Sequence, residues 1–269
     1  MEDILRNYKK IDNIFSNEAE FRIDHQDTEF KLRSKIANKS YMNYLDEVFK
    51  HHSICVMDQY VELFLKGLQK NSIVLDVGSG WCWHWRNISK IRPDVKIIAL
   101  DFIKNNFFHT ENLLSKDSLK QINFLHDDFN NLKIENNSFD AIWSSQAFQH
   151  MKNLDYNFKK AYGLLKKDGY FYNFNLNESF FVKLKKIYKK KRYIENYYYL
   201  NRDINTQIKK LKKIFNTEPK VNYCEFFFHP EIKLTFGREN SKIYQLENFF
   251  SKIKIFNWMA RQVLIKLKK

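Results

Sequence analysis

The stretch "SIVLDVGSGWCWHW", residues 72–85, decides the fold, because a short apolar run ends there in an acid and a glycine turn. An apolar run of this length bounded by a turn is typical of a buried strand. Asp76 is followed by Gly78 and Gly80, two of only six glycines in the chain. Glycine lets the backbone approach a ligand closely, and a following helix offers free N–H groups to an anion. We therefore expect a strand, a ligand-binding turn and a helix.

The same alternation continues beyond this stretch. Apolar runs predict four further strands at 95–101, 122–128, 139–145 and 169–176, with helices between them at about 84–91, 104–115 and 152–166. Strand–helix alternation at this spacing predicts an α/β domain with a mostly parallel sheet and helices on both faces. In such a sheet, ligands bind at the carboxyl ends of the strands, near the point where the strand order reverses.

The flanking regions complete the predicted organisation. The four predicted parts are an N-terminal helical cap (1–70), a core (71–177), a basic, aromatic helical insert acting as a lid (178–238), and a last helix with two antiparallel strands (239–269). The helical cap is predicted from apolar residues that recur at helical spacing from 54 to 68. We expect the two last strands at 252–258 and 261–269.

The residues after the glycine turn narrow the class of ligand. A dinucleotide-binding loop needs a third glycine at position 83, where this chain has Trp83. Asp101 ends the second strand, where a carboxylate could accept both hydroxyls of a ribose. Asp127 and Asp128 end the third strand, where one carboxylate could accept from an adenine amino group. The pattern therefore disfavours a dinucleotide.

Five motifs in this order, "VLDVGSG", "IIALD", "FLHDDF", "NSFDAIWSSQAFQHM" and "AYGLLKKDGYF", give a family resemblance over about residues 72–176. The chain resembles class I S-adenosylmethionine-dependent methyltransferases of the small-molecule type. The resemblance implies a Rossmann-like, doubly wound, seven-stranded sheet that ends in an antiparallel pair, and S-adenosyl-L-methionine as cofactor. Two positions depart from the family pattern: Cys82 replaces a small residue of the loop, and Asp168 precedes Gly169 where proline or glycine is frequent.

The resemblance also implies which residues meet the cofactor. They are Asp76, Gly78, Ser79, Gly80, Asp101, Phe102, Asp127, Asp128, Phe129, Ser144, Ser145 and Gln146. The first four would surround the methionine end, Asp101 the ribose, and Phe102 would border the adenine. Asp127 and Asp128 compete for the adenine amino group, and the last three would lie near the sulfonium.

Methyl transfer from a sulfonium depends largely on alignment and exclusion of water, because the leaving group is already activated. A hydroxyl acceptor gains from a base that removes its proton. His150 is the candidate base, or else a histidine that packs at the next helix, and Gln149 is the candidate that orients the acceptor. We predict no metal ligands. The tryptophans at 81, 83 and 85 should divide between the core and the wall of the site.

The charge is concentrated at one end of the chain. The net charge is +15, and residues 178–269 carry 22 basic against 8 acidic residues. This basic surface leaves three hypotheses open. The first is an enzyme for a small, anionic acceptor, such as a sugar, nucleotide sugar, phosphorylated metabolite or glycan precursor. The others are an RNA methyltransferase and a non-catalytic, cofactor-binding partner subunit. The first is favoured, because no separate RNA-binding module is visible.

Three scattered cysteines at 55, 82 and 224 lack the spacing of a metal site or a disulfide framework. The sequence has no apolar run of about 18 residues. Its N-terminus lacks the order of a secretory signal. These features predict a cytoplasmic protein without a membrane span.

Overall fold

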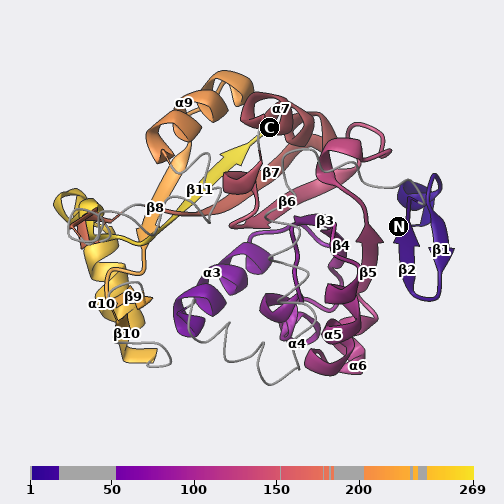
Figure 1. Ribbon diagram of the computed structural model, residues 1–269, viewed down its shortest axis with the longest axis horizontal. Coiled ribbons are helices and arrows are strands. Elements are labelled where there is room, and N and C mark those ends of the chain that lie inside the picture. The colour runs from indigo at the N-terminus through magenta and orange to yellow at the C-terminus, as the bar shows by residue number, and fades with distance from the viewer. Residues whose placement is uncertain are drawn as a thin grey trace.

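The computed structural model describes residues 2–17, 53–151, 153–177, 179–181, 183–184, 203–230, 233–235 and 241–269. Within these ranges the main sheet has nine strands, in the order β1-β2-β5-β4-β3-β6-β7-β11-β8 (Figure 1). They are β1 (Lys9–Ile11), β2 (Ile14–Ser16), β3 (Ile73–Val77), β4 (Lys96–Asp101), β5 (Ile122–His126), β6 (Phe139–Ser145), β7 (Leu165–Leu176), β8 (Lys220–Cys224) and β11 (Gln262–Lys268). A separate pair joins β9 (Phe228–His229) to β10 (Leu234–Thr235).

The predicted parallel, Rossmann-like sheet is confirmed. Strands β2, β5, β4, β3, β6 and β7 are parallel neighbours, whereas β1, β11 and β8 pair antiparallel. The chain moves from β3 to β4 and β5 on one side, then returns to place β6 on the other side of β3. This reversal puts the switch point at the carboxyl end of β3, where the glycine turn lies.

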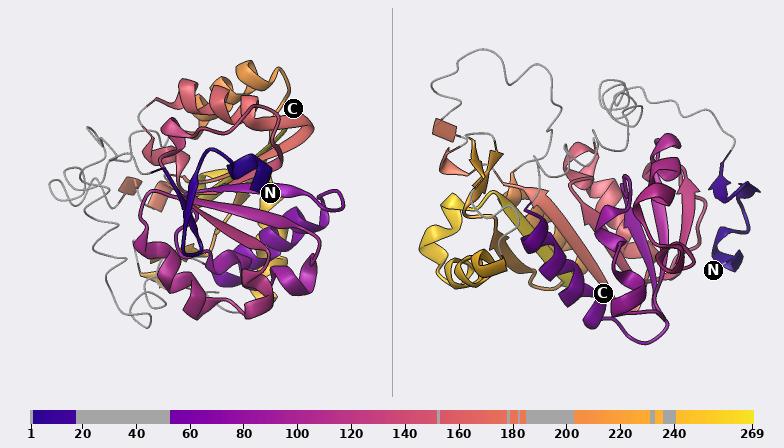
Figure 2. Two further views of the ribbon diagram at one scale, coloured as in Figure 1. Left: turned by 90° about the vertical axis from the view of Figure 1, so that its right-hand side faces the viewer. Right: turned by 90° about the horizontal axis from the view of Figure 1, so that it is seen from below.

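Helices cover both faces of the sheet, as Figures 1 and 2 show. The described α-helices are α3 (Ile54–Lys66), α4 (Ile88–Ile91), α5 (Asn105–Leu113), α6 (Lys116–Leu119), α7 (Leu154–Leu164), α9 (Ile204–Phe215) and α10 (Ser241–Ser251). Short 3-10 helices are η1 (Glu2–Leu5), η2 (Trp83–Trp85), η3 (Phe129–Asn131), η4 (Phe148–His150) and η6 (Lys254–Met259). Side chains that are adjacent along a strand point to opposite faces of the sheet. Leu75 therefore belongs to the hydrophobic cluster under α7 and α9, and Val74 to the cluster under α3 and α4.

The N-terminal prediction was right for α3 but wrong for residues 2–17. These residues form η1 and a β1–β2 hairpin, and β2 extends the sheet by pairing in parallel with β5. Ile14 and Phe15 are buried by that pairing. A strand of three residues carries almost no local signal, because its stability comes from its neighbours in the sheet. The remainder of the predicted cap, residues 18–52, lies outside the described residues.

The predicted strand at 252–258 was also wrong, because residues 254–259 form the 3-10 helix η6. The antiparallel partner of β11 is β8, which the sequence assigned to the helical insert. Helix α9 packs against α7 and β11, and it buries Leu211 and Phe215. This part of the predicted lid is therefore core structure. The segment 185–202 of the insert lies outside the described residues.

A buried ion pair ties the end of the sheet to α3. Arg261 Nη1 donates to Glu225 Oε2 at 2.6 Å, and both side chains are at most 3% exposed. Glu225 Oε1 accepts from the Ser53 backbone N–H at 3.1 Å, just before α3. The carboxylate therefore connects three segments that are far apart in the sequence.

Replacing Arg261 by alanine should lower the free energy of unfolding by about 3–5 kcal/mol, because it leaves the Glu225 carboxylate buried without its cation. Chemical denaturation monitored by circular dichroism measures this. The matched control is Arg6→Ala, which breaks the exposed pair with Glu135 and should cost at most about 1 kcal/mol. Equal losses in the two variants would contradict this assignment.

Candidate functional site

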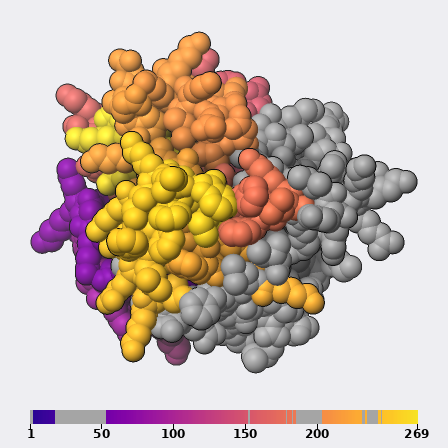
Figure 3. Space-filling view, turned by 90° about the vertical axis from the view of Figure 1, so that its left-hand side faces the viewer, coloured from indigo at the N-terminus to yellow at the C-terminus, as the bar shows by residue number. Residues whose placement is uncertain are grey.

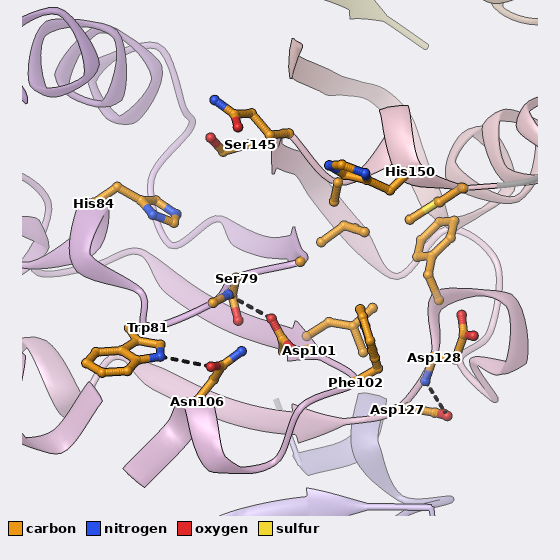
Figure 4. A pocket seen from close by; sticks show the side chains of 18 of the residues that line it. Ser79, Trp81, His84, Asp101, Phe102, Asn106, Asp127, Asp128, Ser145 and His150 are labelled. Atoms are coloured by element: carbon orange, nitrogen blue, oxygen red, sulfur yellow. Dashed lines mark hydrogen bonds between the residues drawn. The ribbon is translucent and has the colours of Figure 1, made fainter. Parts of the chain in front are cut away.

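A pocket opens at the carboxyl ends of β3, β4, β5 and β6, at the switch point of the sheet (Figure 4). Its lining comes from the loops that follow these strands: Val77, Gly78, Ser79, Gly80, Trp81, Trp83, His84, Leu100, Asp101, Phe102, Asn106, Asp127, Asp128, Phe129, Ser145, Gln146, Ala147, His150 and Met151. Most of the predicted site residues therefore meet in one cavity, although they are spread along the sequence from Gly78 to His150.

The glycine turn forms one side of this pocket. Gly78 and Gly80 have φ values of +73° and +54°, which residues with a Cβ rarely adopt. A Cβ built on Gly78 would lie 2.5 Å from the Ala147 Cβ, so no side chain fits there. The Gly78 and Ser79 backbone N–H groups donate to Leu100 O at 2.9 and 3.0 Å, which fastens the turn to β4. The turn thus offers bare backbone to a ligand.

Asp101 links two of the loops that line the pocket. Its Oδ2 accepts from the Gly80 N–H and its Oδ1 from the Ile103 N–H, both at 2.8 Å. The side chain is almost fully buried. The carboxylate is therefore held in one orientation at the end of β4, the place predicted for the residue that meets a ribose.

The geometry separates the roles of the two consecutive acids after β5. Asp127 is 1% exposed, and both its oxygens are engaged: Oδ2 accepts from Tyr8 O–H at 2.8 Å, and Oδ1 from the Asp128 N–H at 2.8 Å. Asp128 is half-buried, and its Oδ1 accepts from the Asn130 backbone and side-chain N–H groups. Among the described residues, Asp128 Oδ2 has no such partner. This favours Asp128 as the residue for the adenine amino group.

Burial shifts several pKa values at this end of the pocket. It raises the pKa of the Asp127 carboxyl, although the Tyr8 hydrogen bond opposes the shift. It also raises the pKa of Tyr8, which accepts from the Lys133 N–H at 2.8 Å. Burial lowers the pKa of Lys160 to about 8, and its ammonium donates to Asn130 O at 2.7 Å. The N-terminal hairpin is thereby connected to the pocket through Tyr8.

His84 is a site residue that the sequence reasoning missed. It lines the pocket and its Nε2 lies 3.0 Å from Asp76 Oδ2. The same carboxylate oxygen accepts from Trp85 Nε1 at 2.7 Å. Asp76 is fully buried but is not part of the pocket lining, so it acts on the pocket through His84. Three tryptophans within five positions, 81–85, drew attention away from this histidine, because a cluster of tryptophans is typical of core packing.

The tryptophans divide as expected between the wall and the core. Trp81 lines the pocket, stacks on His109 with ring centroids 3.8 Å apart, and donates from Nε1 to Asn106 Oδ1 at 2.8 Å. Trp83 also lines the pocket. Trp85 is fully buried in the core and positions Asp76.

Cys82 is the N-cap residue just before η2 and has a φ of +54°, in the left-handed region that favours glycine. Burial, and then the charge of Asp76, raise the pKa of its thiol well above the ordinary value. The thiol therefore stays protonated, and the departure from the family pattern adds no nucleophile to the site.

Of the residues predicted at the end of β6 and just after it, some line the pocket and others do not. Ser145, Gln146 and His150 line it, whereas Ser144 and Gln149 are fully buried outside the lining. Gln149 Oε1 accepts from the Leu176 N–H at 2.8 Å, and its Nε2 lies 3.1 Å from His150 Nε2. Gln149 therefore positions His150 and does not reach the cavity, contrary to the prediction that it orients the acceptor.

The residues present fit S-adenosylmethionine on three observations. Gly78 has no room for a Cβ, because one would meet Ala147, so the turn presents only backbone at the edge of the pocket. Asp101 and Asp128 both line the pocket, and their carboxylates are the kind of acceptor that a ribose and an adenine amino group would need. Asp76 Oδ1 is buried behind the lining without a partner among the described residues, where a water could connect it to a ligand. The individual contacts stay predictions.

Comparison with known proteins agrees with this geometry. Residues 74–169 match the family described as "Methyltransferase domain". No curated protein matches the sequence. Similar solved structures include an S-adenosylmethionine-dependent methyltransferase from Thermotoga maritima, with a TM-score of 0.56 and 16% identity over 87% of this chain and 98% of that one.

Two further structures share the fold. The Haloferax volcanii complex of the Trm112 methyltransferase activator with a methyltransferase gives a TM-score of 0.55 and 14% identity, covering 88% of this chain and 96% of that one. Phosphoethanolamine N-methyltransferase 2 from Haemonchus contortus was solved with phosphomonomethylethanolamine and S-adenosylhomocysteine. It gives a TM-score of 0.53 and 18% identity, covering 79% of this chain and 52% of that one.

Gly78→Ala should weaken cofactor binding by at least about tenfold, because the added Cβ strains a left-handed residue by about 1–2 kcal/mol and meets Ala147. Isothermal titration calorimetry measures the affinity. Gly67→Ala is the control, since Gly67 has a φ of −81° at the end of α3. Unchanged affinity in Gly78→Ala would contradict the proposed cradle.

The acids after β5 should respond differently to the same change. Asp128→Asn should weaken cofactor binding by about tenfold or more, because it removes a charged hydrogen-bond acceptor. Asp127→Asn should mainly lower the melting temperature, because one remaining oxygen cannot serve both Tyr8 and the Asp128 N–H. Calorimetry and thermal unfolding of the two variants test this, and a reversed pattern would assign the adenine contact to Asp127.

Proposed function

Because this chain is a class I S-adenosylmethionine-dependent methyltransferase, we propose that it methylates a hydroxyl oxygen of a small, anionic acceptor. Sugars, nucleotide sugars, phosphorylated metabolites and glycan precursors belong to this class. When bound, S-adenosylmethionine supplies an activated methyl group. The observation that carries the proposal is a histidine at the pocket, His84, held by the buried carboxylate of Asp76.

The hydrogen bonds assign opposite roles to the two histidines of the pocket. A carboxylate only accepts, so His84 Nε2 carries a proton toward Asp76, and the Nδ1 of the neutral ring is left as a proton acceptor. His150 differs, because the Gln149 oxygen already accepts from Leu176 N–H. The Gln149 amide N–H therefore donates to His150 Nε2, and the neutral His150 ring carries its proton on Nδ1.

These tautomers move the proposed base from His150 to His84. A neutral His84 can take the proton of an acceptor hydroxyl at Nδ1, and the buried Asp76 then stabilises the imidazolium that forms. His150 is suited instead to hydrogen bonding across the pocket. Trp85, which donates to the same Asp76 oxygen, keeps the carboxylate in place during this exchange. A base is useful for a hydroxyl acceptor, whereas a free amine does not require one.

The pocket also holds an amide donor for an oxygen-rich acceptor. Gln146 lines the pocket and adopts a φ of +61°. Its Nε2 is buried without a hydrogen-bond partner among the described residues. A buried donor in this state favours a ligand with an acceptor atom. Ser145, beside it on the pocket wall, offers a hydroxyl for the same purpose.

One comparison supports a small acceptor over RNA. Among the structures with this fold, the Haemonchus contortus enzyme holds a small phosphorylated molecule. The lysine-rich sequence of the insert gives the chain a positive charge that would attract an anionic acceptor.

Asp101→Ala tests the cofactor assignment, and a panel of acceptors tests the substrate class. Calorimetry with S-adenosylmethionine should show a large loss of affinity in this variant. Transfer of labelled methyl groups should then be measured on sugars, nucleotide sugars and phosphorylated metabolites, with total RNA as the alternative. Turnover on RNA alone would refute the proposed acceptor class.

His84→Ala should lower kcat by about 10²–10⁴-fold on the accepted substrate, while cofactor affinity measured by calorimetry changes little. His150→Ala is the matched control at the same pocket, and it should lower kcat much less. If His84→Ala retains the rate, the base lies elsewhere.

A further inference from the structure

One face of the molecule gathers exposed apolar side chains. It consists of α10, η6 and the described residues of 179–184, which Figure 3 shows as a yellow region beside a salmon one. Nine large apolar side chains are exposed in the described ranges, and six belong to this face: Phe180, Leu184, Leu246, Phe249, Ile255 and Trp258. Single exposed apolar residues are ordinary, but a group of this kind marks an interaction surface. We call it the α10 face.

The members of the α10 face are connected. Leu246 and Phe249 are three residues apart on α10, and therefore share one side of the helix. Ile255 and Trp258 are three residues apart on η6, a 3-10 helix in which such residues lie on the same side. The Trp258 ring packs against Phe180, with centroids 5.1 Å apart. The face is thus continuous from η6 to the segment at 180.

Phenylalanine contacts connect α10 with η6 beneath this surface. Phe250 lies between the other two rings, with its centroid 5.8 Å from that of Phe249 and 4.7 Å from that of Phe256. Ile255 is 71% exposed although it neighbours this cluster, so it protrudes from the packed layer. The exposed side chains therefore rest on a rigid aromatic base.

The exposed charges of α10 and η6 have one sign. In 241–260 the exposed charged residues are Lys242, Lys252 and Lys254, and the only acid there, Glu247, is buried. Glu247 is turned inward because its carboxylate accepts from the Phe226 and Phe227 backbone N–H groups. The apolar groups that protrude from 241–260 are thus accompanied by exposed lysines and by no exposed acid of the same segment.

We propose that the α10 face docks on an anionic lipid bilayer. Amphipathic helices with Trp, Phe and Leu on one side and Lys around them lie in the membrane interface, and anionic headgroups strengthen the attachment. Lysine stems can reach outward while their apolar carbons follow the surface. Among the described helices, none is long and apolar enough to cross a membrane, so this attachment is peripheral.

The chemistry of the face favours lipid over the other polyanions. Half of the exposed side chains of the face, Leu184, Leu246 and Ile255, are aliphatic and offer no ring for a nucleic-acid base to stack on, whereas all six can enter an acyl layer. Ile255 and Phe249 protrude, and a fluid acyl layer accommodates protruding groups without a matching cavity. An acidic protein with a complementary groove is the remaining alternative, and the experiment distinguishes it.

Trp258 provides a direct probe in the full-length protein. It is 49% exposed, whereas Trp81, Trp83, Trp85 and Trp143 are at most 8% exposed. Vesicles of phosphatidylglycerol and phosphatidylcholine should shift the tryptophan emission to the blue and sediment the protein. Pure phosphatidylcholine vesicles should do so at least about tenfold more weakly. In Trp258→Phe the shift should disappear while sedimentation persists.

Two variants test the parts of the α10 face separately. Phe249→Ser combined with Ile255→Ser should weaken vesicle binding about tenfold or more, and Leu63→Ser, on α3 with 55% exposure, is the matched control. Lys252→Gln combined with Lys254→Gln should remove the preference for anionic vesicles, with the exposed Lys120→Gln as control. Circular dichroism confirms that each variant is folded.

Several outcomes would overturn the proposal. The first is no binding of the wild-type protein to anionic vesicles at low salt. The second is equal binding by the Phe249/Ile255 double variant and the Leu63 control. Capture of an acidic protein or RNA that depends on Phe249 and Ile255, without vesicle binding, would assign the face to that partner instead.

Discussion

The buried carboxylate of Asp76 is the constraint on which the site depends. It is fully buried at the end of β3, so it needs donors from the protein. Trp85 and His84 supply them to a single oxygen. To bring both rings back onto Asp76, the chain must turn sharply, and it does so through Gly78, Gly80 and the left-handed Cys82. The same turn places Trp81, Trp83 and His84 along the pocket.

Segments that are distant in the sequence are held to the pocket and to the edge of the sheet by hydrogen bonds to acidic side chains. Tyr8, from the hairpin that extends the sheet, occupies Asp127 and thereby leaves Asp128 as the half-buried carboxylate. At the other edge, Glu225 receives Arg261 and the start of α3. In both cases a carboxylate removed from water is held by groups remote in sequence. The fold and the site are therefore stabilised by the same kind of interaction.

Most of the central sheet could be predicted from the sequence, because buried parallel strands are continuous apolar runs. Residues 139–145 agree with β6 at both ends. The edges could not be predicted in this way. Strand β8 alternates between exposed and half-buried residues, and its partner β11 lies about forty positions later. Residues 252–258 are rich in β-formers, yet residues 254–259 form a 3-10 helix, and β8 occupies the place beside β11 that they were predicted to take.

The sequence by itself determined the fold class, the position of the glycine turn and the residue types that surround a nucleoside cofactor. These follow from local patterns, since a strand, its turn and its terminal acid are neighbours in the chain. Only the tertiary structure decided which of two acids is engaged by Tyr8, that Gln149 faces inward, and that His84 lies against Asp76. Those choices depend on contacts between side chains from different strands, and burial of a charge permits only arrangements in which a donor meets it.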